Sequence, residues 1–166
     1  MSNLTASQKD TLANFASRAN KLEKIVAGLS EQELEYSIAP GEWTIRQIVH
    51  HLAGDGDAWS KPFWRAITTP GATITRDGFA GTGIWVDTIN SNNCPVQISL
   101  TLIKAHRRLI AELAERFPDS WEQDVTILNP EGKGQKIPAA QIINMLSEHM
   151  AEHLSTIEAI QKRHNV

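Results

Sequence analysis

Apolar residues recur every three or four positions along four stretches of the chain, and this spacing predicts amphipathic helices. The expected helices cover about 5–28, a segment beginning at Thr44, a segment from Pro95 to Pro118, and a last segment that Pro138 opens. Each has one apolar face, and such faces leave water most simply by packing together as a four-helix bundle. We therefore expect an all-α fold.

The second helix has a clear start and an interrupted middle. Thr44 is followed three residues later by Gln47, a capping box typical of a helix N-terminus. Gly54 and Gly56 are expected to interrupt the helix, and Pro62 either to kink it or to begin a new one.

Two connecting segments lack helical periodicity. Residues 68–93 are rich in Thr, Gly and Asn, which predicts a long loop between the second and third helices, with short extended pieces or a turn around 85–90. Between 121 and 137, the turn sequence Asn129-Pro130-Glu131-Gly132 could join two short strands before the last helix. The bundle is thus expected to carry a long loop and a possible hairpin.

The last helix carries two histidines on its apolar face. That face is formed by Ile142, Leu146, His149, His153, Ile157 and Ile160. His149 and His153 are four residues apart, so their rings stand one above the other, about 40° apart in direction. A metal binds imidazole nitrogens at about 2.0–2.1 Å and offsets the cost of burying them. With a third histidine on another apolar helix face, the pair indicates a metal site.

The third histidine must come from the adjacent pair His50 and His51. Neighbouring helical residues point about 100° apart, so only one of the two can face a shared centre. Ile48 and Leu52 surround the direction of His51, which favours it over His50. The candidate ligands are therefore His51, His149 and His153, a set that leaves coordination positions for water or substrate. Hydrogen-bonded core histidines are the alternative.

Two further residues are candidates for chemistry. Asp55 lies four residues after His51 and could orient or assist the metal, with a solvated loop carboxylate as the alternative. His106 belongs to the apolar face expected for the third helix, where it could line the pocket, shuttle protons, pack in the core or bind the metal. That face comprises Leu102, Ile103, His106, Leu109, Ile110, Leu113 and Phe117. Tryptophans are more often core residues than stacking platforms, but Trp59 and Trp64 could also wall an apolar substrate pocket.

Composition excludes several classes of function. With 16 basic and 19 acidic residues, a net charge of −3 and no basic run longer than Arg107-Arg108, nucleic acid is not an expected partner. The single cysteine, Cys94, fits a reducing compartment, and no stretch of 18 apolar residues occurs, so we expect a cytoplasmic protein without a membrane span. The chain length fits a single domain covering 1–166. Glu152 does not occupy the glutamate position of His-Glu-x-x-His metalloproteases.

Two motifs together resemble the DinB-like superfamily, in particular its YfiT-like branch. They are the run from Pro40 to Ala53, Pro-Gly-Glu-Trp-Thr-Ile-Arg-Gln-Ile-Val-His-His-Leu-Ala, and the later His149-Met-Ala-Glu-His153-Leu. The resemblance implies a four-helix bundle, commonly a homodimer, with a divalent metal such as nickel, zinc or iron. By motif position, the ligands carry over to His51, His149 and His153.

The resemblance also implies an activity. Members transfer low-molecular-weight thiols, such as bacillithiol or mycothiol, to electrophiles or use them in isomerisation, and others carry the label metal-dependent hydrolase. This chain differs in having Gly54-Asp-Gly-Asp57 where the thiol-transferase branch has Asp-Ser-His, and His106-Arg-Arg108 for His-x-Arg-Trp.

Three functions follow from these observations. The first is a metal-dependent thiol transferase that acts on small electrophiles. The second is a hydrolase using metal-bound hydroxide, with Asp55 or His106 as proton acceptor. The third is a non-catalytic, stress-associated metal-binding protein.

Overall fold

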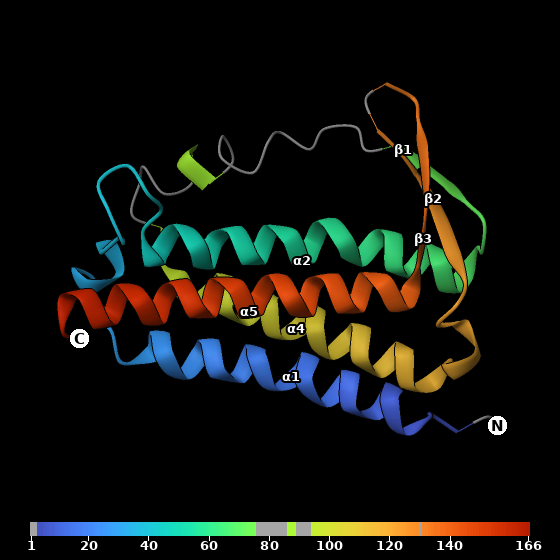
Figure 1. Cartoon of the computed structure of the whole chain (residues 1–166), viewed down its shortest axis with the longest axis horizontal. Coiled ribbons are helices and arrows are strands. Elements are labelled where there is room, and N and C mark those ends of the chain that lie inside the picture. The colour runs from blue at the N-terminus through green and yellow to red at the C-terminus, as the bar shows by residue number, and fades with distance from the viewer. Residues whose placement is uncertain (1–2, 76–85, 89–93, 130) are drawn as a thin grey trace.

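The four expected helices form the body of the molecule. The computed structural model describes residues 3–75, 86–88, 94–129 and 131–166. Four long helices lie side by side (Figure 1): α1 (Ala6–Ala27), α2 (Ile45–Thr68), α4 (Val96–Arg116) and α5 (Ala139–His164). Helix α2 packs against α4 and α5, and α1 packs against the same two helices. The predicted four-helix bundle is confirmed, and none of the described helices is long and apolar enough to cross a membrane.

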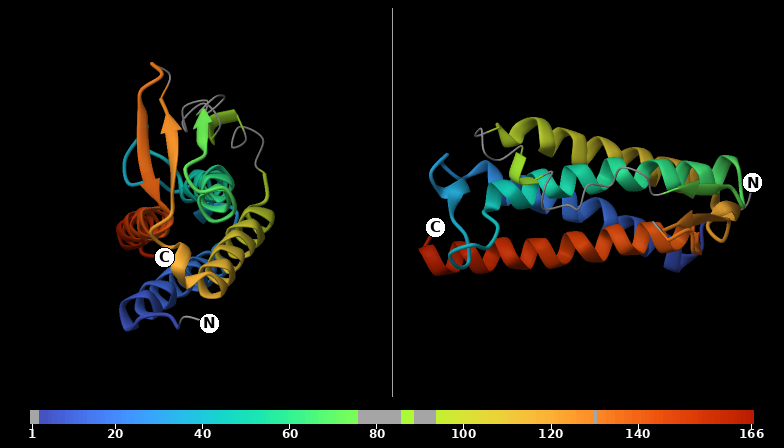
Figure 2. Two further views of the ribbon diagram at one scale, coloured as in Figure 1. Left: turned by 90° about the vertical axis from the view of Figure 1, so that its right-hand side faces the viewer. Right: turned by 90° about the horizontal axis from the view of Figure 1, so that it is seen from above.

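A small sheet stands at one end of the bundle. It has the order β1-β2-β3, formed by β1 (Thr73–Thr75), β2 (Asp124–Leu128) and β3 (Gly134–Pro138). The antiparallel pair β2–β3 is the hairpin expected from the turn sequence, and Figure 2 shows it projecting away from the helices. β1 pairs in parallel with β2 and is a short extended piece within the expected loop. Of the segment 85–90, only 86–88 are described, and they are helical.

Helix α2 is continuous, which corrects the predicted interruption at Gly54 and Gly56. Thr44 caps it as expected, since its hydroxyl accepts from the Gln47 N–H at 3.2 Å. A glycine costs about 1 kcal/mol in a helix interior, and burial of a face along the whole of α2 outweighs this cost. Gly56 also lies where α4 approaches closely: a Cβ added there would be 2.8 Å from His106 Nδ1. Pro62 lies inside the helix and starts no new element.

Helix α4 buries a face that only partly matches the predicted one: Ile103 and Ile110 are buried as expected, and other predicted members are not. Leu102, Leu109 and Phe117 are exposed. The buried residues of α4 are Val96, Leu100, Ile103, Arg107, Ile110 and Ala114. Arg107 can lie in the core because its guanidinium donates to the carbonyls of Phe15 at 3.0 Å and of Leu146 at 2.6 Å. A charged residue in the middle of the stripe concealed the true face.

Candidate metal centre

Three imidazoles from two packed helices meet at one point. His149 Nε2 lies 3.1 Å from His51 Nε2 and 2.9 Å from His153 Nε2. One ring nitrogen from each histidine lies within 4.8 Å of the others. The rings meet at steep angles of 69–89°, so their nitrogens, and not their faces, converge. The three residues predicted as ligands are therefore brought together by α2 and α5.

The spacing of these nitrogens fits a single first-row metal ion. Metal–nitrogen bonds of about 2.0–2.1 Å in tetrahedral geometry place two ligand nitrogens about 3.3 Å apart. The observed separations of 2.9 and 3.1 Å are close to that value. Within the described part of the chain, no second group of three His, Cys, Asp or Glu residues has such geometry.

Burial favours the neutral, metal-binding form of two of the three imidazoles, His51 and His153. Burial, together with the potential positive charges on the neighbouring His149 and His51, lowers the pKa of His153 to about 4. The pKa of His51 is also lowered by burial, although the nearby Asp55 opposes the shift. The lone pairs of these two rings are thus free at neutral pH, as coordination requires.

Asp55 accepts a hydrogen bond from the ring nitrogen of His149 that faces away from the other two histidines. Its Oδ2 accepts from His149 Nδ1 at 2.7 Å and lies 3.6 Å from His51 Nε2. A proton on Nδ1 leaves the lone pair of His149 on Nε2, which points to the centre. Because α2 is continuous, Asp55 lies on the helix and not in a loop, with only 16% of its side chain exposed.

His50 lies outside the centre. Its Nε2 donates to the Cys94 carbonyl at 3.1 Å, and its Nδ1 accepts from the Ser99 hydroxyl at 2.8 Å. Both ring nitrogens are occupied, and burial lowers the pKa of the ring. Of the two adjacent histidines, only His51 faces the cluster.

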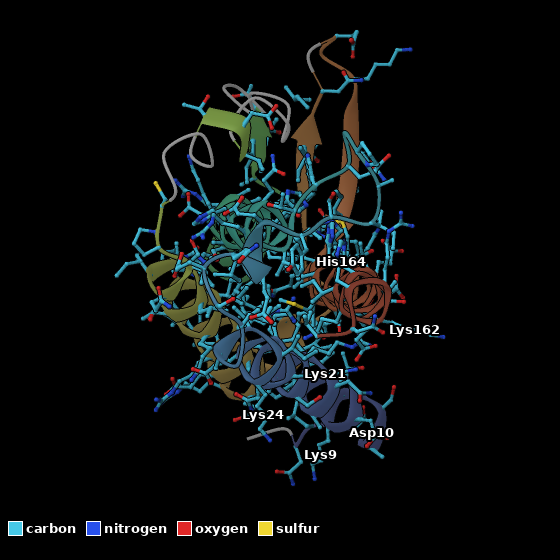
Figure 3. All side chains as sticks on the ribbon, turned by 90° about the vertical axis from the view of Figure 1, so that its left-hand side faces the viewer. Lys9, Asp10, Lys21, Lys24, Lys162 and His164 are labelled. Atoms are coloured by element: carbon cyan, nitrogen blue, oxygen red, sulfur yellow. The ribbon has the colours of Figure 1, made fainter. Side chains whose placement is uncertain are left out.

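His106 and His164 do not join the cluster either. His106 lies on α4 beside Gly56, and its Nε2 is 3.9 Å from the exposed Asp57 carboxylate. His164 lies at the C-terminal end of α5 (Figure 3), where its ring stacks on Tyr36.

A groove of about 810 Å³ opens beside the centre. It is lined by His51, Asp55 and Trp59 from α2, by His149 from α5, and by residues of the β2–β3 hairpin. The hairpin residues are Ile127, Asn129, Lys133, Gly134, Gln135 and Ile137. Sequence reasoning predicted the hairpin but not its place in the pocket, because strand periodicity carries no information about which helices a strand will face.

Two tryptophans differ from expectation. Trp64 is 44% exposed and lies in a separate groove with Leu113 and Phe117, so it is not a wall of the groove beside the three-histidine cluster. Trp43, which was not singled out, covers the centre: its ring is 4.8 Å from that of His51 and stacks 6.2 Å from that of His153. Trp43 directly precedes Thr44, the N-cap of the helix that carries His51, and this position was the one sequence feature that could have placed it near the site.

Comparison with known proteins gives consistent matches. A family model described as the DinB superfamily matches residues 14–157. A relative from Geobacillus thermodenitrificans is 28% identical over 157 residues, covering 93% of this chain and 84% of the relative. A relative from Oceanobacillus iheyensis is 31% identical over 146 residues, covering 86% and 78%. Both are named "Putative metal-dependent hydrolase".

Two solved structures share the fold. YfiT from Bacillus subtilis superposes with a TM-score of 0.81 at 18% identity, covering 99% of this chain and 92% of that one. A mycothiol-dependent maleylpyruvate isomerase superposes with a TM-score of 0.66 at 17% identity, covering 96% and 65%.

Proposed function

The chain belongs to the DinB superfamily, and from that premise we propose that it is an enzyme whose divalent metal is held by His51, His149 and His153. The observation that carries the proposal is the convergence of three Nε2 atoms, with separations of 2.9 and 3.1 Å, at the edge of an open groove. The names of the curated relatives support metal dependence. Nickel, zinc and iron all suit three imidazole ligands.

The protein's own side chains prepare the site for catalysis. When bound, a dication held by neutral imidazoles lowers the pKa of a coordinated thiol or water. Asp55 fixes the orientation of His149, and Trp43 shields His51 and His153 on one side. The side that faces the groove stays open, so substrate approaches between α5 and the hairpin.

We favour transfer of a low-molecular-weight thiol to a small electrophile. A groove of about 810 Å³ lies within the usual range for small-molecule sites, about 300–1,000 Å³. Trp59, Ile127 and Met145 offer apolar surface for the electrophile. Gln135 and Lys133 offer polar groups for the polar parts of the electrophile and the thiol. The fold shared with a mycothiol-dependent isomerase supports a thiol cosubstrate.

Hydrolysis is the second candidate, and the position of Asp55 favours it. Its carboxylate lines the groove beside the ligands and can accept a proton from a nucleophilic water. His106 does not line the groove, so of the two expected proton acceptors only Asp55 has direct access.

The test is a product assay on metal-loaded protein with a panel of thiols and a chromogenic electrophile, alongside ester and amide substrates without thiol. Thiol-dependent product formation that is lost in His153→Ala supports transfer. Cleavage without thiol, lost in the same variant, supports hydrolysis in its place. Metal binding without turnover of either panel contradicts both and leaves the non-catalytic function.

A further inference from the structure

A small, partly enclosed cavity lies between α2, α4 and α5. The space that the centre of a water molecule can occupy in it is about 10 Å³. Asp55 and His149 line both the groove and this cavity, so the two spaces meet at this pair. The remaining polar groups of the cavity come from His106 and Arg107 on α4.

One ring nitrogen of His106, a residue that lines the cavity, lacks a hydrogen-bond partner among the described residues. This atom, Nδ1, is buried. Gly56 allows the close approach, because any side chain at that position would meet His106 Nδ1 at 2.8 Å. A buried polar atom left unpaired costs about 1–3 kcal/mol, so a partner is expected.

The size and lining of the cavity suit a single water molecule. A site needs roughly 10–15 Å³ of such volume and two or more polar partners to hold water. Arg107 already donates to the Phe15 and Leu146 carbonyls, so it is not the group that lacks a partner. The Asp55 carboxylate uses Oδ2 for His149 and has Oδ1 as a further acceptor.

We propose that one buried water in this cavity links His106 Nδ1 to the Asp55 carboxylate, and that His106 is thereby a positioning residue for the Asp55–His149 pair. The water donates one hydrogen to Nδ1 and the other to Oδ1 of Asp55. The His106 proton then resides on Nε2, on the side of the Asp57 carboxylate. This inference rests on the proposed metal centre, because its consequence is a His149 ring held more firmly for coordination.

The link has a measurable effect on metal binding. Outer partners of metal ligands are typically worth about 10–100-fold in affinity. Loss of the water lets the Asp55 carboxylate rotate away from His149, so the effect of removing His106 belongs at the lower end of that range.

The experiment uses the full chain loaded with Co²⁺, which gives hyperfine-shifted NMR signals for the N–H groups of its histidine ligands. His106→Phe removes the acceptor and fills the cavity. We expect its Co²⁺ dissociation constant to rise about tenfold and the His149 N–H to exchange with solvent about tenfold faster. His106→Asn keeps an acceptor near the position of Nδ1 and is expected to stay within about twofold of wild type, as is the control Asp57→Asn at an exposed carboxylate.

Unchanged affinity and unchanged exchange in a folded His106→Phe protein overturn the inference and leave the metal centre standing. A wild-type protein that binds no Co²⁺ overturns the metal centre and this inference together. Should His106→Phe fail to fold, a high-resolution crystal structure of the wild type decides: density for a water between His106 Nδ1 and Asp55 supports the link, and its absence refutes it.

Discussion

His50 and His51 are neighbours on α2, equally buried, and their surroundings differ completely. The two nitrogens of His50 are bonded to Ser99 and to the Cys94 carbonyl. His51 directs Nε2 at two other imidazoles, and its buried Nδ1 has no hydrogen-bond partner among the described residues. A buried histidine whose ring nitrogens are both hydrogen-bonded within the protein has a structural role. Buried imidazole nitrogens that face one another without such partners are arranged to bind a ligand.

Of the predictions for the three-histidine site, the largest effect on metal affinity is expected when one proposed ligand is removed. Because even outer partners of ligands are worth about 10–100-fold, His153→Ala is expected to weaken metal binding by more than about 100-fold. Titration with Co²⁺ or Zn²⁺ followed by calorimetry measures this. His164→Ala, at the exposed end of α5, is the control and should bind as wild type does. Equal affinities in the two variants would contradict the three-histidine site.

The opposite result is expected at His50. His50→Ala removes two buried hydrogen bonds and leaves a cavity, so the metal-free protein should lose about 2–4 kcal/mol of its free energy of unfolding. Its metal affinity, corrected for the folded fraction, should stay within about twofold of wild type. Chemical denaturation and metal titration of the same sample separate the two quantities. A folded His50→Ala protein that cannot bind metal would abolish the distinction between the two histidines.

Asp55 tests how far the functional region extends beyond the ligands. Asp55→Ala frees the His149 ring, and we expect metal affinity to fall about 10–100-fold. Asp57→Ala, two residues away with 82% of its side chain exposed, is the matched control with no expected change. Similar losses in both variants would point to a general charge effect and not to the Asp55–His149 hydrogen bond.

The smallest expected effect is the pH dependence that His50 contributes. Burial lowers its pKa in the folded state, so between that pKa and about 6.5 the unfolded chain binds more protons. The stability that the neutral ring contributes is therefore present above about pH 6.5 and lost as pH falls through the lowered pKa. Denaturation of metal-free protein from pH 8 to 5 should show a shallower decline in His50→Gln than in wild type. Identical slopes would count against a neutral, buried His50.

Helix faces with uniform chemistry were predictable from sequence, and faces with a charged member were not. The pattern of α5 predicted the positions of His149 and His153 because its other members are Ile and Leu. The predicted face of α4 was right for Ile103 and Ile110 and wrong for the rest of its alignment, because Arg107 occupies a core position. The carbonyls of Phe15 and Leu146, distant in sequence, make that position favourable.

Within the site, residue spacing along one helix did not predict the contacts that are made between helices. The i,i+4 relation suggested Asp55 as a partner of His51, yet its close contact is with His149 on α5, 2.7 Å away. The continuity of α2 through Gly54 and Gly56 reflects burial of its face against α4 and α5, which helix propensity alone does not predict. The homodimer expected from the family resemblance stays a prediction, which sedimentation can measure.

The most direct test of the account is the metal content of protein purified without a histidine tag, measured by elemental analysis beside its His153→Ala variant. Close to one equivalent of a first-row metal per chain is expected in the wild type and almost none in the variant. Equal metal content in the two proteins, or none in a wild type that has also been offered nickel, zinc and iron, would contradict the three-histidine metal site.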